Sequence, residues 1–208
     1  NLPSRAILTT EGRMTLETRT LTRPLEFRAG DSGKKVGGYA AVFNSETDIG
    51  GYFREIIAPG AFADALKGDV RALIDHDSGR VIGRSTAGTL RMAEDKTGLS
   101  VEIDLPDTTD GRDIATLIER GDISGMSFGF IVTKQTWDET GDVPKRTIEA
   151  VELHEVSIVA FPAYDDTTIA MRSLDDARKA KPVHPALDRI RQRKQRESAE
   201  RRFLLSAR

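Results

Sequence analysis

The sequence predicts a mainly β protein of the α+β class, a mostly antiparallel β-barrel or partly closed sheet with flanking short helices. Two observations predict this fold. Runs of apolar, β-rich residues recur at irregular spacing along the chain, and only two short helix-like segments interrupt them. This order differs from the regular alternation of strands and helices that is typical of a wound parallel sheet.

Strand-like segments make up most of the central chain. The clearest is LSVEIDL at residues 99–105, in which apolar and polar side chains alternate as in a half-buried strand. LEFRA at 25–29 is a candidate first strand. The other predicted strands are residues 36–43, 69–75, 126–133 and 147–161, the last of them bent or divided.

Two segments have helical signals. Residues 60–67 carry an apolar face and stop at Gly68, a residue type that commonly ends helices. Residues 110–120 carry a second apolar face, with Asp110 as the expected N-cap and Gly121 as the expected end.

Charge divides the chain into a body and a tail. Residues 174–208 hold 11 basic and 5 acidic residues, a net charge of +6, although the whole chain has a net charge of −2. We therefore predict an acidic body at 1–173 and a basic C-terminal tail at 174–208. The tail is either a solvated or helical extension or a docking segment that folds on a partner.

Absent residue types exclude several kinds of chemistry. The chain contains no cysteine, which excludes disulfides, thiol nucleophiles and thiolate metal sites. The nearly balanced charge does not favour general nucleic-acid binding. No apolar run approaches the length of a membrane span, and the first residues lack a signal-peptide pattern, so we expect a cytosolic protein.

Ser127 is the candidate nucleophile. It lies in GDISGMSFGF, where strand alternation puts it on one face with Gly129 and leaves a gap through which a substrate backbone could approach. The alternative is a strand of small residues packed against a neighbour. Ser124 is the competing hydroxyl, although it belongs more naturally to the turn after the preceding helix.

The chain offers three histidines as a base. His76 lies between Asp75 and Asp77 at the end of a strand-like run, so it either faces a cleft or belongs to an ordinary surface turn. His154 lies inside a strand-like run, where a sheet histidine is the plainer interpretation. His184 lies in the tail between prolines and is a weak candidate.

A serine nucleophile needs a base, and the base needs a third group to orient it. Glu155 is a lone carboxylate in an apolar run, which is costly unless it is paired. Strand alternation places Glu155 and Ser157 on one face and His154 on the other, so the two residues compete for this role. A metal site built from Asp75, His76, Asp77 and His154 is a further hypothesis, but no fixed ligand motif supports it.

Four blocks in the same order, between about residues 36 and 173, resemble the prohead maturation protease family of tailed phages. They are GYAAVFNSETDIGGYFREIIAPGAFADAL, VRALIDHDSGRVIGRSTAGTLRM, RGDISGMSFGF and LHEVSIVAFPAYDDTTIAMRS. The resemblance implies an N-terminal segment at 1–35 and a protease domain at 36–173. It also implies a fold similar to herpesvirus assembly proteases and a serine endopeptidase with the triad Ser127, His76 and Glu155. His154 stays a minor alternative, because the herpesvirus relatives use a second histidine. Asp75 departs from the family, in which many members carry Asn before the histidine.

The resemblance also implies a biological setting. The enzyme would act inside the assembling prohead in the host cytoplasm and cleave the major capsid protein or its scaffold segment, and it would also process itself. It would need no metal or organic cofactor and bind no nucleic acid or membrane, and a homodimer is a candidate for its active form. Arg84 or the turn at Pro162–Tyr164 could stabilise the oxyanion. The rival interpretation is a non-catalytic scaffolding protein that keeps the protease fold.

Overall fold

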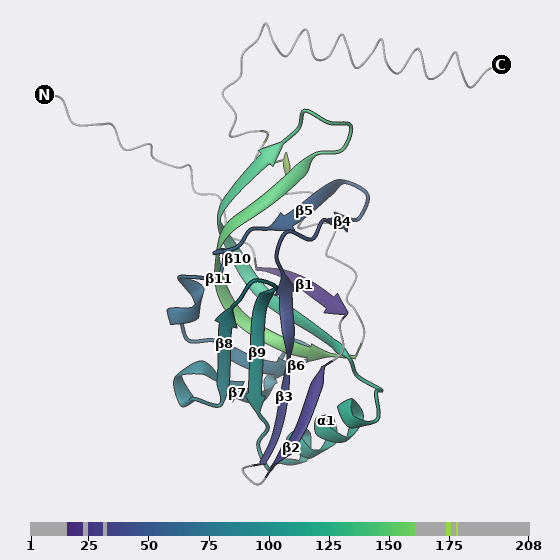
Figure 1. Cartoon of the computed structure of the whole chain (residues 1–208), viewed down its shortest axis with the longest axis vertical. Coiled ribbons are helices and arrows are strands. Elements are labelled where there is room, and N and C mark those ends of the chain that lie inside the picture. Colours follow the sequence, from purple (N-terminus) through teal and green to yellow (C-terminus); the bar gives the residue numbers. More distant parts are fainter. Residues whose placement is uncertain (1–15, 23–24, 31–32, 161–173, 176–177, 179–208) are drawn as a thin grey trace, which may run out of the picture. The chain divides into compact units, whose positions relative to one another are not determined.

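Two β-sheets form the part of the chain described by the computed structural model, which comprises residues 16–22, 25–30, 33–160, 174–175 and 178 (Figure 1). The strands are β1 Glu17–Thr22, β2 Glu26–Gly30, β3 Gly33–Val42, β4 Thr47–Ile49, β5 Phe53–Ile57, β6 Arg71–Ile74, β7 Asp77–Arg84, β8 Leu90–Glu94, β9 Gly98–Asp104, β10 Gly125–Asp138 and β11 Lys145–Val159. The helical elements are α1 Thr109–Glu119 and the 3₁₀ turns η1 Ala65–Lys67 and η2 Ser85–Ala87. The chain divides into two units, residues 1–172 and 173–208.

The larger sheet is organised around the long hairpin of β10 and β11 (Figure 1). Strand β1 pairs antiparallel with the first half of β10. The other edge of β11 carries two parallel partners, β5 beside residues 145–148 and β6 beside residues 155–158. Because β6 ends beside residue 158, the turn that follows it lies next to the last residues of β11.

The smaller sheet has the antiparallel order β2-β3-β9-β8. In β9, Leu99, Val101 and Ile103 are buried and the residues between them are partly exposed, so the alternation predicted for this strand is confirmed. Within the described ranges the strands form these two ladders and no closed barrel. The mainly β class is therefore confirmed, whereas one mixed sheet and one antiparallel sheet stand where a barrel was expected.

The core lies between the two sheets and uses one face of β10. Phe128 packs edge-on against Phe62 at a centroid distance of 5.5 Å and stacks on Phe130 at 4.8 Å. These aromatic side chains, with Met126, are buried among residues of β3, β9 and α1. Since side chains alternate along a strand, Ser127 and Gly129 take the opposite face of β10.

The helix predicted at 110–120 is confirmed as α1, and Gly121 follows it with a left-handed φ of 81°. Its N-cap is Thr108, whose hydroxyl accepts the backbone N–H of Gly111 at 3.2 Å, and not the predicted Asp110. Asp110 lies in the first turn, where it accepts hydrogen bonds from Arg80 of β7.

The helix predicted at 60–67 is wrong over most of its length. Only Ala65–Lys67 is helical, as one 3₁₀ turn, and Gly68 follows in an extended conformation. An eight-residue segment is too short to form a stable helix by itself, because the free-energy cost of nucleating the helix is larger than the stabilisation from its few hydrogen bonds. Tertiary contacts decide its shape instead: Phe62 is fully buried and its backbone N–H donates to Glu94.

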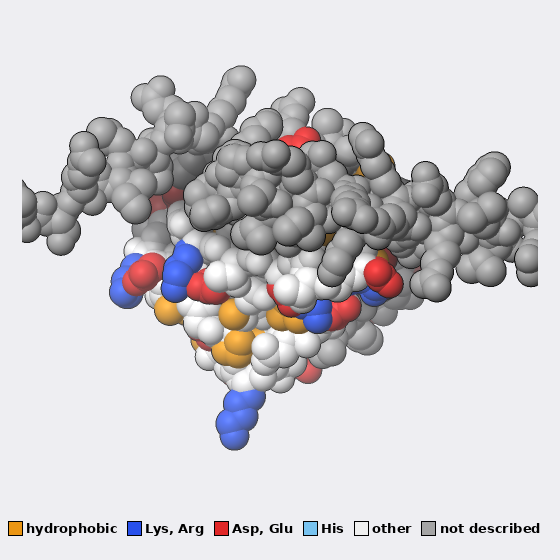
Figure 2. All heavy atoms as spheres, turned by 90° about the horizontal axis from the view of Figure 1, so that it is seen from above, with side chains coloured by type: hydrophobic (Ala, Val, Ile, Leu, Met, Phe, Trp, Pro, Cys, Tyr) orange, Lys and Arg blue, Asp and Glu red, His pale blue; other side chains and the backbone are white. Residues whose placement is uncertain are grey.

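The described surface carries charges of both signs. Figure 2 shows acidic and basic side chains interspersed over the described part of one face. Arg91 illustrates the pattern, since its guanidinium pairs with both Glu102 and Asp104. Among the described residues, no helix has the length and apolarity needed to cross a bilayer. The predicted basic tail lies outside the described residues except for 174–175 and 178.

Candidate active site

Asp75 and His76 form the two-residue turn of the β6–β7 hairpin, because Ile74 pairs with Asp77 across it. Both have a left-handed backbone, with φ of 49° and 61°. A turn with positive φ at both central residues matches the twist of the two strands. Aspartate tolerates this conformation, and histidine is found in it less often than glycine or asparagine. Such a conformation persists only where its surroundings hold it.

Strand β11 and the residue that follows it hold this turn through three hydrogen bonds. The backbone N–H of Asp75 donates to the carbonyl oxygen of Ile158 at 3.0 Å, and the backbone N–H of His76 donates to Oγ of Ser157 at 3.2 Å. In return, the backbone N–H of Ala160 donates to Oδ1 of Asp75 at 3.0 Å. His76 therefore lies in a turn, which was one of the two predictions for it. The three hydrogen bonds hold this turn, with its imidazole, at the end of β11.

His76 and Glu155 are directly hydrogen-bonded, with Nδ1 lying 2.6 Å from Oε1. Because a carboxylate only accepts, Nδ1 carries the proton and Nε2 is the basic nitrogen of the neutral ring. The hydroxyl of Ser157 donates to the second carboxylate oxygen of Glu155 at 2.6 Å. The carboxylate is therefore fixed from both sides, and it orients the imidazole.

The environment raises the pKa of His76 above its ordinary value. The hydrogen bond to Glu155 is the largest cause, partial burial opposes it, and the charges of Glu155 and Asp75 raise the pKa further. The side chain of Asp75 is bonded to Ala160, yet its charge still acts on the ring. Nε2 of His76 is buried and has no hydrogen-bond partner.

Ser127 lies on the strand next to this pair. It is fully buried and faces Ser157 directly in the β10–β11 ladder, so both hydroxyls project from the same face of the sheet. Its hydroxyl donates to the backbone carbonyl of Arg19 in β1 at 2.9 Å. Thus Ser127, His76 and Glu155 share one face, and the serine hydroxyl is turned toward β1.

The gap predicted beside Ser127 is occupied. Gly129 pairs with Glu155 across the ladder, and a Cβ atom at residue 129 would lie 2.5 Å from Oε1 of Glu155. The missing side chain therefore makes room for the carboxylate and not for a substrate backbone.

The other candidates lie elsewhere. His154 projects from the opposite face of β11, with its side chain 41% exposed and Nε2 3.4 Å from Glu152. Arg84 is paired with Asp69 through two hydrogen bonds. His184 and the turn at Pro162–Tyr164 fall outside the described residues.

Both carboxylates of the metal hypothesis already accept hydrogen bonds from backbone N–H groups. Oδ1 of Asp75 accepts from Ala160, and Oδ1 of Asp77 accepts the backbone N–H of Gly79 at 2.8 Å. Within the described part of the chain, no three His, Asp or Glu side chains converge on a common point where a metal ion could bind.

Sequence reasoning missed Ser157 as the group that ties Glu155 to the turn, and it missed β1 altogether. Strand β1 covers the edge of β10, with Thr20 paired to Ser127. A signal was present in ETRTLT, where Thr18, Thr20 and Thr22 alternate with larger side chains in a strand-like pattern.

Residues 22–180 match the sequence profile of the caudovirus prohead serine protease family. The chain belongs to this family. It is 36% identical over 142 residues to the prohead protease of Enterobacteria phage HK97, an alignment that covers 66% of this chain and 60% of that protein. It is 32% identical over 96 residues to the prohead protease of Escherichia phage T5, covering 46% of this chain and 42% of the relative.

Among solved structures, the fold of this family member is similar to that of the bacteriophage T4 capsid assembly protease, gp21. The superposition has a TM-score of 0.54 at 13% identity and covers 73% of this chain and 100% of the T4 chain. At that identity the similarity concerns the fold alone. The chain spans 60% of the length of the HK97 relative and 42% of that of the T5 relative.

Proposed function

We propose that this prohead protease family member is a serine endopeptidase that cleaves capsid-protein or scaffold segments inside the immature prohead, and that it also processes itself. The observation that carries the proposal is the partly buried His76–Glu155 hydrogen bond at 2.6 Å, with Nε2 of His76 unpartnered and Glu155 on the face of the sheet that holds Ser127. Family membership and the names of the HK97, T5 and T4 relatives support the setting.

The proposed reaction follows from these three side chains. The Ser127 hydroxyl turns from the Arg19 carbonyl toward Nε2 of His76, which takes its proton as Oγ bonds to the scissile carbonyl carbon. The carbonyl π electrons move to oxygen, and they re-form the double bond when the C–N bond breaks. His76 gives its proton to the leaving amine, and water hydrolyses the acyl-enzyme by the same steps. Glu155 stabilises the imidazolium throughout.

Two further proposals follow from the family resemblance, and a third follows from the charge of the tail. The fold is similar to that of herpesvirus assembly proteases, the active form is a homodimer, and residues 174–208 dock on the scaffold until cleavage releases them. The net charge of +6 on the tail against an acidic body supports separate roles for the two parts.

The decisive experiment is co-expression of the chain with its cognate major capsid protein, followed by mass measurement of the products. The intact chain should shorten the capsid protein and itself, and Ser127→Ala should do neither while keeping its circular dichroism spectrum. Ser124→Ala is the matched control, because this competing hydroxyl is exposed and should be dispensable. Cleavage by Ser127→Ala would disprove the nucleophile.

Two rivals give different results in the same experiment. A scaffolding protein without activity would assemble with the capsid protein and leave both masses unchanged. A metalloenzyme would lose cleavage on treatment with a chelator, whereas the serine mechanism needs no metal and should continue at its usual rate.

A further inference from the structure

Three hydroxyl side chains form a row across the larger sheet. Thr20 of β1 pairs with Ser127 of β10, which pairs with Ser157 of β11, and directly paired residues project from the same face. Ser157 accepts from the backbone N–H of His76 and donates to Glu155, and Ser127 donates to Arg19. Oγ1 of Thr20 is buried and has no hydrogen-bond partner. A buried hydroxyl without a partner is costly, so it needs an explanation.

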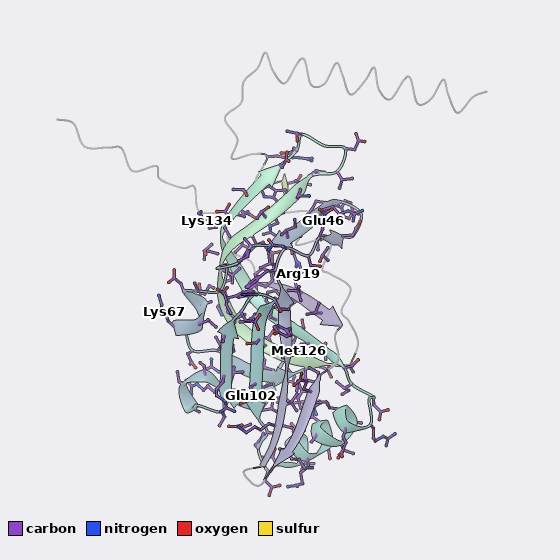
Figure 3. The ribbon with its side chains drawn as sticks, viewed as in Figure 1. Arg19, Glu46, Lys67, Glu102, Met126 and Lys134 are labelled. Carbon is purple, nitrogen blue, oxygen red and sulfur yellow. The ribbon has the colours of Figure 1, made fainter. Side chains whose placement is uncertain are left out.

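The strand that carries Thr20 is anchored by buried charges on its other face. The guanidinium of Arg19 bonds to Glu17 and Glu55, at 2.6–2.9 Å, and that of Arg146 bonds to the same two carboxylates at 2.8–2.9 Å. All four residues are less than 10% exposed. Figure 3 labels Arg19 beside β1, about halfway along the described ribbon. The backbone directly before Thr20 is therefore anchored by buried charges at Glu17 and Arg19.

The two sides of Ser127 carry different groups. On the side of β11 lie Glu155 and Ser157, which hold the turn of His76. On the side of β1 lies Thr20, with a hydroxyl that can still donate. The family match begins at residue 22, so it does not include Thr20.

We propose that the Thr20 hydroxyl donates a hydrogen bond to the scissile carbonyl oxygen as that oxygen becomes an oxyanion. The inference rests on the proposed serine mechanism. Directly paired Cβ atoms in an antiparallel ladder lie about 4.5–5.5 Å apart, so a carbonyl bonded to Ser127 Oγ has its oxygen within reach of Thr20 Oγ1. The π electrons of the carbonyl move to that oxygen as its carbon bonds to Ser127, while the serine proton goes to His76. A donor preorganised where charge develops is the usual means of stabilising such an intermediate.

The test measures the rate at which a fluorophosphonate probe labels the full chain, because its serine adduct is tetrahedral and carries an oxygen where the oxyanion would lie. Thr20→Val keeps the shape and removes the hydroxyl, and it should lower the labelling rate about 10²–10³-fold. Thr20→Ser restores a hydroxyl and should recover most of the rate. Thr18→Val is the matched control, since Thr18 lies on the same face of β1 two residues away, and it should label like the intact chain.

A melting curve separates this role from a structural one. Replacing a buried, unpartnered hydroxyl by a methyl group should leave the melting temperature of Thr20→Val unchanged or higher. A rate loss under about tenfold, or a loss explained by a lower folded fraction, overturns the role of Thr20. Absence of labelling in the intact chain, or labelling that persists in Ser127→Ala, overturns the proposed function instead.

Discussion

The side chain of Glu155 fills the position that a side chain at Gly129, its partner in the β10–β11 ladder, would take. A Cβ atom at residue 129 would lie 2.5 Å from Oε1 of Glu155 and 3.2 Å from its Cγ and Cδ atoms. Oε1 is also the oxygen that binds Nδ1 of His76. The absence of a side chain at Gly129 is therefore a condition for the His76–Glu155 hydrogen bond.

Gly129→Ala should separate activity from folding. The atoms that must move belong to a side chain and not to the backbone, so the sheet should persist while the carboxylate leaves His76. Because a misplacement of about 1 Å can reduce a rate about 10²-fold, we expect capsid-protein cleavage to fall by that order.

A sheet glycine with room for a methyl group provides the control for this variant. A Cβ at Gly37 would make ordinary contact, 3.5 Å from the nearest atom, so Gly37→Ala should cleave normally in the same assay. Normal cleavage by Gly129→Ala would mean that the carboxylate has another way to reach the imidazole.

The activity and the stability that depend on His76 should change with pH in opposite directions. Since the neutral ring is the base, cleavage should rise as pH increases through the raised pKa of His76. A raised pKa also means that the native state binds the proton more tightly than the unfolded chain. The stabilisation by the His76–Glu155 pair is therefore complete below the ordinary pKa of histidine and is lost as pH rises through the raised value. Rate profiles and denaturant titrations across this range would test both signs.

Two substitutions should move the acidic limb of that profile by different amounts. Glu155→Gln removes the main cause of the raised pKa, so the limb should shift clearly to lower pH while the maximal rate falls. Asp75→Asn removes a smaller contribution and keeps an oxygen for the Ala160 N–H, so it should shift the limb slightly and preserve the rate. Titration of the His76 ring by NMR would check both shifts, and equal shifts would contradict this order.

Arg146→Met should destabilise the fold strongly. Arg146 is fully buried and its guanidinium binds Glu17 and Glu55, so its loss leaves two buried carboxylates with Arg19 alone. Breaking a buried ion pair by removing one partner costs about 3–5 kcal/mol, which denaturant unfolding would measure.

An exposed ion pair provides the comparison for Arg146. Arg112 pairs with Asp107 at 2.7 Å, but both side chains are largely exposed. Arg112→Met should change the free energy of unfolding by no more than about 0.5 kcal/mol. A similarly small effect of Arg146→Met would show that the buried cluster does not hold β1.

Several elements were predictable because their signals are local. The alternation at residues 99–105 and the apolar face at 110–120 each correspond to the observed element. The segment at 60–67 misled the prediction, since its conformation depends on the burial of Phe62 and not on helical spacing. A closed barrel could not be predicted from the strand patterns, because alternation within a strand does not show which strands pair with each other.

By itself, the sequence determined the mainly β class, the acidic body and basic tail, and the residue types available for chemistry in a chain without cysteine. Its motif blocks also pointed to the family. Only the tertiary structure decided that the turn at His76 is hydrogen-bonded to β11, that Glu155 rather than His154 meets the imidazole, and that β1 covers Ser127. The physical reason is distance along the chain: patterns of period two or 3.6 report a residue's own element, whereas these contacts join residues 79 to 108 positions apart.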